Sequence, residues 1–277
     1  MASEPPAELL YRRRIRPGRA LRDLWAVREV VVSLARRDFL VRYKQTFLGV
    51  LWAVFTPLAL VVVFTLLFDR VARVSTGGAP YALFAYLGLL PWTFLSTSLS
   101  QGGLSLEANR HLLNRVAFPR EVFPVATVAV AAVDMLIASS VLVVLFAAYG
   151  VAPRATSLWV PLLLAVHLAF VLGLALTVAV GVVYARDLRH LIPIVLQIGL
   201  FATPVAYGME AVPGGWRLAY SVVNPMAPVI DGLRRTVLWG SAPQWDLFAA
   251  AALGAAAVLT GGYALFKRLE TGLADIA

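Results

Sequence analysis

The sequence predicts an all-α membrane protein with six transmembrane helices. Of its 277 residues, 60% are hydrophobic and only 14% are charged, whereas soluble domains average about 45–50% apolar and 25% charged residues. The charged residues also cluster between apolar stretches, and about 20 mainly apolar residues are needed to cross a bilayer as a helix. Lipid is therefore the expected solvent for most of the surface.

Six apolar segments meet or approach the length of a membrane span. In chain order they are Phe47–Phe68, Tyr81–Leu104, Val122–Tyr149, Leu158–Tyr184, Leu191–Tyr207 and Leu247–Phe266. The fifth segment is shorter and carries a proline near each end, at Pro193 and Pro204. Small residues recur at every fourth position of the fourth segment, which predicts close packing against another helix; they are Ala169, Gly173, Thr177, Gly181 and Ala185.

The lysines and arginines indicate the orientation of these spans. Eighteen of the 24 fall on the side of the N-terminal arm, and six fall on the other side. Loops rich in lysine and arginine stay in the cytoplasm. Both termini are therefore expected in the cytoplasm, as an even number of spans requires. The net charge of +9 is expected to contact anionic lipid headgroups rather than nucleic acid.

The N-terminal arm divides into a basic tail, residues 1–20, and a predicted amphipathic helix over residues 21–46. Leu24, Val27, Val31 and Leu34 recur at helical spacing opposite charged residues. Such a helix is expected to lie in the cytoplasmic membrane interface, where it either contacts a partner or serves only as an anchor. Its candidate functional residues are Arg28, Arg36, Arg37, Asp38, Arg42 and Tyr43.

The cytoplasmic loop over residues 107–121 is a candidate docking site. It reads EANRHLLNRVAFPRE, in which Leu112, Leu113 and Val116 form a short apolar ridge with a charged rim, and Pro119 ends any helix. A short helix of this kind suits binding to a cytoplasmic protein, although the arginines of a solvated loop would also set topology. The candidate contact residues are Glu107, Asn109, Arg110, His111, Leu112, Leu113, Asn114 and Arg115.

The outer segment over residues 208–246 is too apolar for a solvated loop, yet its apolar pieces, 218–223 and 229–238, are too short to cross. Re-entrant half-helices are predicted, because irregular backbone at membrane depth must be buried in protein or line a cavity. They serve either as a gate or as a plug that fills space. The candidate gate residues are Tyr207, Met209, Asn224, Pro225 and Met226.

Little in the chain points to chemistry of its own. Asp134 and His167 are the clear ionisable residues at membrane depth, too few for a proton relay. The histidines have no metal-ligand spacing, and cysteine is absent. Neither lysine, Lys44 or Lys267, stands in a phosphate-binding P-loop. No catalytic residue, metal or cofactor is therefore expected, and ATP-driven work would need a second polypeptide.

Five stretches, in order, resemble the permeases of polysaccharide-exporting ABC transporters. This type-two export class includes the exporters of O-antigen, capsule, teichoic acid and galactan. The stretches are RRDFLVRYKQTFLGVLWAVFTPL (Arg36–Leu58), the long run Tyr86–Glu121, YARDLRHLIPIVLQ (Tyr184–Gln197), NPMAPVIDGLRRTVL (Asn224–Leu238) and the tail RLETGLADIA. Together they cover nearly the whole chain after the first 20 residues, which have no assigned counterpart.

The resemblance implies a permease homodimer in a prokaryotic plasma membrane, with two separate ATPase subunits that bind ATP and Mg²⁺. The arm would be an interface helix, the 107–121 loop a coupling helix and the outer segment a set of gate helices. Residues 47–266 would form the transmembrane domain and 267–277 a cytoplasmic tail. The implied cargo is a polyprenyl-pyrophosphate-linked polysaccharide; the alternatives are a drug or small lipid carried by an ABC exporter, or an ion-coupled secondary transporter. Candidate residues along the substrate path are Trp52, Tyr86, Trp92 and Asp134.

Overall fold

A computed structural model describes residues 25–44, 46–71, 74–113, 119–152 and 154–270 of the chain. Every regular element in these ranges is a helix, so the predicted all-α class is confirmed. The basic tail over residues 1–20 and most of the C-terminal tail lie outside the described residues.

Five helical stretches are long and apolar enough to cross a membrane. They are Gly49–Asp69, Tyr81–Gly102 (α4), Val122–Tyr149 (α7), Ala155–Tyr184 and Trp245–Leu269 (α12). The first combines a 3-10 turn (η2, Gly49–Leu51), helix α3 (Trp52–Phe64) and a widened π-helical end (η3, Thr65–Val71). The fourth combines η4 (Ala155–Trp159) with α8 (Val160–Tyr184).

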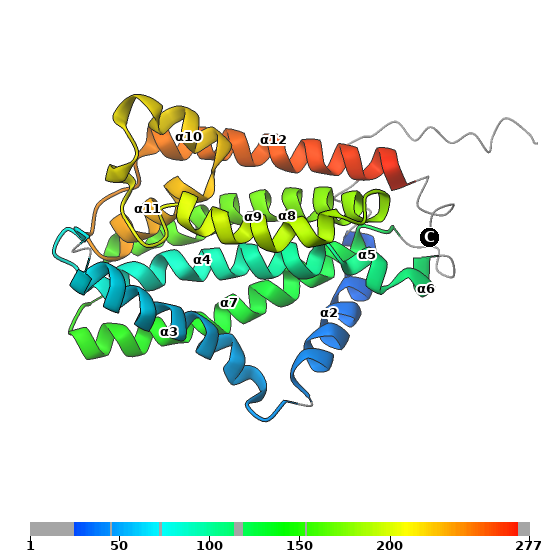
Figure 1. The fold of residues 1–277 in the computed structure, drawn as a ribbon, viewed down its shortest axis with the longest axis horizontal. Helices are drawn as coiled ribbons and strands as arrows, with labels where there is room; N and C mark the ends of the chain where they lie inside the picture. Colours follow the sequence, from blue (N-terminus) through cyan, green and yellow to red (C-terminus); the bar gives the residue numbers. More distant parts are fainter. Residues whose placement is uncertain (1–24, 45, 72–73, 114–118, 153, 271–277) are drawn as a thin grey trace, which may run out of the picture.

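Helix α4 lies at the centre of the bundle, in contact with α3, α7 and α8 (Figure 1). Of the five stretches it is the most buried inside the protein and has the lowest hydropathy. The two properties fit together, because its hydroxyl and amide side chains avoid lipid when other helices surround them. The other spans keep apolar side chains on the outside, such as Val143 and Leu253, which are about 70% exposed.

The predicted small-residue stripe packs against α12 at Gly173 and Thr177, whereas Gly181 lies against Leu188 of α9. A Cβ added to Gly173 would lie 2.6 Å from backbone atoms of Leu259, and one added to Gly262 would lie 2.3 Å from the Gly173 carbonyl oxygen. Backbones this close leave no room for side chains, which is how small residues at every fourth position hold membrane helices together.

The fifth predicted span is shorter than expected. Helix α9 runs only from Leu188 to Ala202, 15 residues, or about 22 Å at 1.5 Å per residue. That is less than the hydrocarbon thickness of about 30 Å. The chain then continues through two 3-10 turns, η5 (Met209–Ala211) and η6 (Gly214–Trp216), into the short helices α10 (Arg217–Val223) and α11 (Met226–Val237). Five of the six predicted transmembrane helices qualify by length and composition, and α9, predicted as the shorter fifth span, is a shorter apolar helix.

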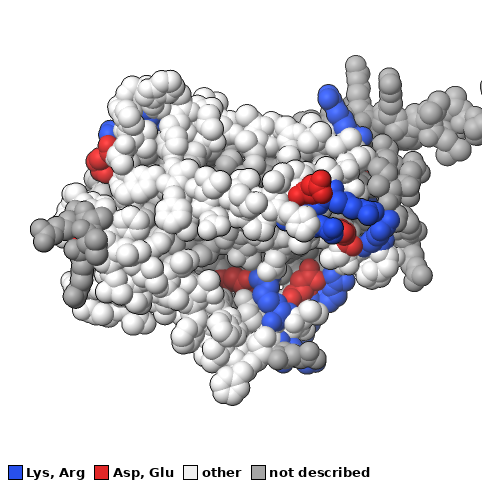
Figure 2. All heavy atoms as spheres, in the orientation of Figure 1, with Lys and Arg blue, Asp and Glu red and all other residues white. Residues whose placement is uncertain are grey.

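The charged side chains gather at one end of the molecule. Helices α2 (Arg28–Tyr43), α5 (Ser105–Ala108) and α6 (Arg110–Leu113) lie at this end, and α10 and α11 lie at the opposite end (Figure 1). Figure 2 shows lysines, arginines and carboxylates clustered around the first group, with a broad uncharged surface between the two ends. We call them the α2 end and the α11 end.

Candidate functional site

A half-open pocket of about 320 Å³ lies where α2, α3, α4 and α7 meet. We call it the Asp134 pocket. Its wall combines the charged end of α2 with hydroxyl and amide groups from the central helix α4 and a single carboxylate from α7. The lining residues are Arg42, Tyr43, Trp52, Ala53, Thr56, Pro57, Thr93, Phe94, Ser96, Thr97, Gln101, Ala131, Asp134, Met135 and Ala138.

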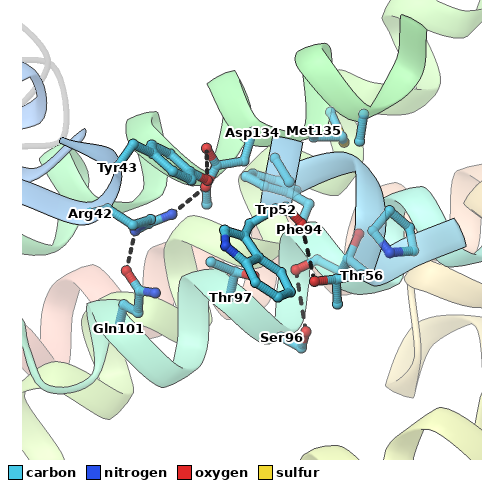
Figure 3. Close-up of a pocket in the computed structure, with 15 residues that line it drawn as sticks. Arg42, Tyr43, Trp52, Thr56, Phe94, Ser96, Thr97, Gln101, Asp134 and Met135 are labelled. Atoms are coloured by element: carbon cyan, nitrogen blue, oxygen red, sulfur yellow. Dashed lines mark hydrogen bonds and ion pairs between the residues drawn. The ribbon is translucent and has the colours of Figure 1, made fainter. Parts of the chain in front are cut away.

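The Arg42 guanidinium joins three helices in this pocket. It forms an ion pair with the Asp134 carboxylate and donates a hydrogen bond to the Gln101 side-chain oxygen (Figure 3). The Tyr43 hydroxyl donates to the other Asp134 oxygen at 2.9 Å. The Arg42 and Asp134 side chains are only 20% and 15% exposed, so each neutralises a charge that would otherwise be costly at membrane depth.

Tyr43 has a donor role in this cluster. Burial, reinforced by the hydrogen bond to Asp134 and the charge of that carboxylate, raises the pKa of the Tyr43 phenol above its ordinary value. The hydroxyl therefore stays protonated and continues to donate to Asp134.

Two of the four candidate substrate-path residues, Trp52 and Asp134, line the Asp134 pocket. Figure 3 shows Trp52 and Thr56 of α3 pointing toward Ser96 and Thr97 of α4, and Trp52 is 50% exposed. The other two lie elsewhere, in the core of the bundle. The Tyr86 side chain is fully buried and donates to the Ala138 carbonyl at 2.7 Å. Trp92 is 6% exposed and packs against Gly199 of α9.

The candidate coupling loop begins with α5 and α6. Glu107, Arg110 and His111 are exposed, whereas Asn109 is buried and its amide donates to the Ser105 carbonyl at 2.8 Å. Leu112 packs toward the bundle against a core cluster that contains Leu106, Phe123 and Phe266. The side chain of Leu113 and residues Asn114 and Arg115 lie outside the described part of the chain.

Two polar contacts connect this loop to its neighbours. The Arg37 guanidinium of α2 donates to the Asn109 side-chain oxygen at 2.7 Å while also holding Asp38. At the start of α9, Arg189 lies 3.6 Å from the Glu107 carboxylate. Because α2 also holds Asp134 through Arg42, a displacement of α5 would act on α2, α9 and the Asp134 pocket together.

The rest of α2 contacts the bundle through some side chains and exposes others, and the exposed ones include the apolar Val32, Leu40 and Val41. Leu34 packs against the same core cluster as Leu112. Arg36 is exposed, and Arg28 is exposed beside the Trp25 ring, 5.4 Å from its centroid. Helix α2 starts at Arg28, and Trp25 and Ala26 just before it are also helical; the predicted start at residue 21 lies outside the described residues.

The last turn of α12 is tied to the start of α7 at the α2 end. The Lys267 ammonium lies 2.6 Å from a Glu121 carboxylate oxygen and 2.9 Å from Glu270. Glu121 immediately precedes α7 and its side chain is 1% exposed. Burial raises the pKa of Glu121 above its ordinary value, although Lys267 acts in the opposite direction.

At the α11 end, Arg234 organises the broken segment that follows α9. Its side chain is almost fully buried, and its three nitrogens donate to four backbone carbonyls at 2.5–3.0 Å: those of Phe84, Pro204, Val205 and Tyr207. The guanidinium also lies 3.5 Å from the centroid of the Phe84 ring. One side chain thus supplies the donors that this irregular backbone needs at depth.

The candidate gate residues surround this segment. Tyr207 donates to the Phe201 carbonyl at 2.8 Å, and the Asn224 amide donates to Thr203 and Tyr220 between α10 and α9. Pro225 directly precedes α11. Met226 and Met209 are buried, the latter in a small cluster with Ala227 and Leu247. The two short helices occur where the sequence predicted half-helices.

Comparison with known proteins places the chain in a family. The sequence pattern of the ABC-2 type transporter family matches residues 29–238. The chain belongs to this family. It is 30% identical to an O-antigen export system permease protein of Myxococcus xanthus, over 93% of this chain and 98% of that relative. It is 26% identical to a protein of the same description from Klebsiella pneumoniae, over 90% and 95%. A polysialic acid transport protein of Escherichia coli is 23% identical over 91% and 98%.

This ABC-2 permease contains two features that sequence reasoning did not identify. Arg42 and Asp134 were assigned to separate roles, although an arginine at the end of an amphipathic helix and a lone carboxylate in a span are natural partners. The second is the burial of Arg234. The sequence signal for it is an arginine within a short, largely apolar outer piece of a segment that prolines interrupt, where unpaired carbonyls are expected.

Proposed function

We propose that this chain is the membrane subunit of an ABC exporter that moves a lipid-linked polysaccharide across the plasma membrane. The observation that carries the proposal is the similarity to O-antigen export permeases, which extends over 93% of the chain and 98% of the Myxococcus relative. A shared fold alone would not identify the molecule that is exported. The similarity extends over nearly the whole chain. It therefore includes the N-terminal arm, the loop over residues 107–121 and the outer segment, which are the parts expected to take part in transport.

The energy for export comes from a separate ATPase subunit. The chain's two lysines stand outside any P-loop sequence, so ATP would be hydrolysed by a second polypeptide. That ATPase would dock at the α2 end, where the charged side chains cluster (Figure 2). The exposed side chains of Glu107, Arg110 and His111 offer the contact surface. Movement of α5 would then reach α2 through Arg37 and α9 through Arg189.

Two copies of the permease enclose the path that the polysaccharide takes across the membrane. In support, α9 has no buried residue in the single chain, and its apolar side chains Ile194, Val195 and Ile198 are 53–64% exposed. The α3 helix likewise exposes Phe55 and Val62. These faces need either lipid or a second copy. Helix α9, lengthened by the segment that follows it, is the sixth crossing that leaves both termini in the cytoplasm, the side with most of the arginines.

The Asp134 pocket is the proposed entry for the carbohydrate end of the cargo. It offers three aromatic rings, Tyr43, Trp52 and Phe94, beside several hydroxyl groups and the Gln101 amide, and aromatic rings next to polar groups suit a sugar ligand. The outer helices α10 and α11 form the proposed gate at the other end of the path.

Reconstitution tests this function. The chain is copurified with its partner ATPase, placed in proteoliposomes and supplied with the lipid-linked polymer isolated from the same cells. We expect polymer to cross only with ATP, and Arg110→Glu to reduce copurification of the ATPase without affecting membrane insertion. Transport driven by an ion gradient without ATP would contradict the proposal, and so would ATP-driven transport of small lipids or drugs but not of the polymer.

A further inference from the structure

Helix α12 extends from the α11 end to the α2 end of the molecule (Figure 1). Its 25 residues correspond to a length of about 38 Å at 1.5 Å per residue. Prolines lie inside α3, α4 and α9, at Pro57, Pro91 and Pro193, whereas α12 contains none. Because a proline inside a helix removes a backbone hydrogen bond and kinks it, α12 is better suited than these helices to carry a displacement along its length.

The last turn of α12 holds the residues that end the candidate coupling loop. The Lys267 ammonium lies between the carboxylates of Glu121, at 2.6 Å, and Glu270, at 2.9 Å. Arg120 donates from its backbone N–H to the Glu270 carboxylate at 3.2 Å and from its guanidinium to the Glu270 carbonyl at 2.6 Å. The Glu121 side chain is 1% exposed, and a charge buried this deeply is costly without its partner. The exit of the loop is therefore fixed to α12.

The same turn also contacts the beginning of the loop and the end of α8. Phe266 has no exposed surface and lies in one apolar cluster with Leu106 of α5, against which Leu112 of α6 packs. Tyr184, the last residue of α8, donates its hydroxyl proton to the Leu269 carbonyl at 2.8 Å. Both ends of the loop thus contact a single helical turn, and a displacement of the loop would move that turn.

At the α11 end, α12 lies directly against the short helix α10. A Cβ added to Gly254 would overlap the Val222 carbonyl and lie 3.1 Å from the side chain of Pro225, which directly precedes α11. Close-packed elements transmit strain because few voids separate them. A movement of α12 would therefore reach α10 and, through Pro225, α11.

We propose that α12 transmits the movement of the coupling loop to the outer gate helices α10 and α11. Lys267 and Glu270 are the positioning residues at its input, and Gly254 is the position of its output. A loop displaced by the ATPase would pull on Arg120 and Glu121, shift the last turn of α12 and so move α10. The inference rests on the proposed function, because only an ATP-driven permease has a loop that an ATPase moves.

Helix α4 is another route between the two ends. Arg234 of α11 donates to its Phe84 carbonyl at 3.0 Å. However, α4 carries Pro91 in its interior and ends at Gly102, before the separate helix α5 begins. The two routes lead to different expectations, because only the route through α12 depends on Lys267 and Glu270.

The movement of α10 can be measured directly. Since the chain has no cysteine, Leu218→Cys, at a position of α10 that is 55% exposed, provides a single site for an environment-sensitive fluorophore. The labelled permease is assembled with a cysteine-free ATPase in lipid nanodiscs and ATP is added. We expect a fluorescence change that falls at least threefold in Glu270→Gln and in Lys267→Met. Lys267→Arg keeps the charge and should retain the response.

Matched variants separate transmission from a general loss of charge or packing. Asp187→Asn removes an exposed carboxylate that makes no capping hydrogen bond at the start of α9, and it should respond like the wild type. Gly254→Ala should reduce the response from the output side. Gly261→Ala, whose added Cβ meets nothing within 4 Å, should leave the response intact. The ATPase should copurify equally with all of these variants.

The outcomes separate this inference from the proposed function. An undiminished response in assembled complexes of Glu270→Gln and Lys267→Met overturns the inference, and polymer export by the same complexes leaves the function standing. Polymer export without any fluorescence change in the wild type also overturns it, because α10 then does not move. So does loss of ATPase binding in Glu270→Gln, since the turn would then serve docking. A response that depends on these residues in a complex that exports no polysaccharide supports transmission through α12 and removes the proposed cargo.

Discussion

The Arg42 guanidinium of α2 forms an ion pair with the Asp134 carboxylate of α7, a residue 92 positions later in the chain. Gln101 of α4 binds the same guanidinium, and Tyr43 binds the same carboxylate. The end of helix α2 is thereby fixed to α4 and α7, two helices long and apolar enough to span a membrane, at the wall of the Asp134 pocket. A movement of α2 would consequently change the shape of the Asp134 pocket.

Asp134→Asn is expected to destabilise the protein by about 1–3 kcal/mol. Removal of one partner from a fully buried ion pair costs about 3–5 kcal/mol, and this pair keeps some exposure. Thermal unfolding in detergent measures the loss for Asp134→Asn, for Arg42→Met and for the double variant. The double variant should lose less than the two single losses combined, because neither charge is left alone. Strictly additive losses would show that the two side chains do not interact.

The parts of the fold that depend on local pattern were predictable. Five of the predicted spans and the close approach at Gly173 follow from apolar length and spacing alone. Helix α9 was overestimated because the apolar run continues past Ala202, where the backbone leaves the helix and Arg234 takes up its carbonyls. Contacts across the bundle, such as Arg42 with Asp134, were not predictable because hydropathy does not record which faces of two helices meet.

Arg37→Gln is expected to uncouple ATP hydrolysis from transport. The substitution removes the charged donor that holds Asn109 of the candidate coupling loop, a contact worth about 1 kcal/mol at a partly exposed position. Transport per ATP hydrolysed in proteoliposomes should fall roughly threefold to tenfold, while copurification of the ATPase is unchanged. Arg36→Gln, the exposed neighbour on the same helix, is the control and should transport normally. Equal effects of the two substitutions would point to loss of surface charge instead.

The contribution of Glu121 to stability is expected to depend on pH. Burial raises its folded-state pKa above the unfolded value of about 4.3, so the folded protein binds the proton more tightly. Its contribution therefore increases as the pH falls through the raised folded-state pKa and levels off below about 4.3. Melting temperatures of the wild type and Glu121→Gln, compared from pH 8 to pH 4.5, should show the wild type gaining relative to the variant at lower pH. A difference that stays constant over this range would exclude the raised pKa.

Arg234→Met is expected to cost about 3–5 kcal/mol, because it leaves four buried carbonyls without the donors that now satisfy them. Arg234→Lys should recover only part of the loss, since an ammonium group has three donors and cannot match the planar fork. Thermal unfolding gives the magnitude, and limited proteolysis between Thr203 and Gly208 shows where the structure loosens. If the variants melt like the wild type and this segment stays protected, Arg234 does not hold it.

Gly88→Ala disturbs the same contact from the α4 side and leaves the arginine in place. The added Cβ would lie 2.6 Å from the Val205 carbonyl oxygen and 2.7 Å from the Arg234 guanidinium, so either the segment or the arginine must move, at a cost of about 1–3 kcal/mol. Gly261→Ala in α12 is the matched control, because its added Cβ meets nothing within 4 Å and alanine is favoured over glycine in a helix by about 0.5–1 kcal/mol. Opposite shifts in melting temperature are therefore expected, downward for Gly88→Ala and upward for Gly261→Ala. A Gly88→Ala protein that melts at or above the wild-type temperature would show that the outer segment does not pack this closely on α4.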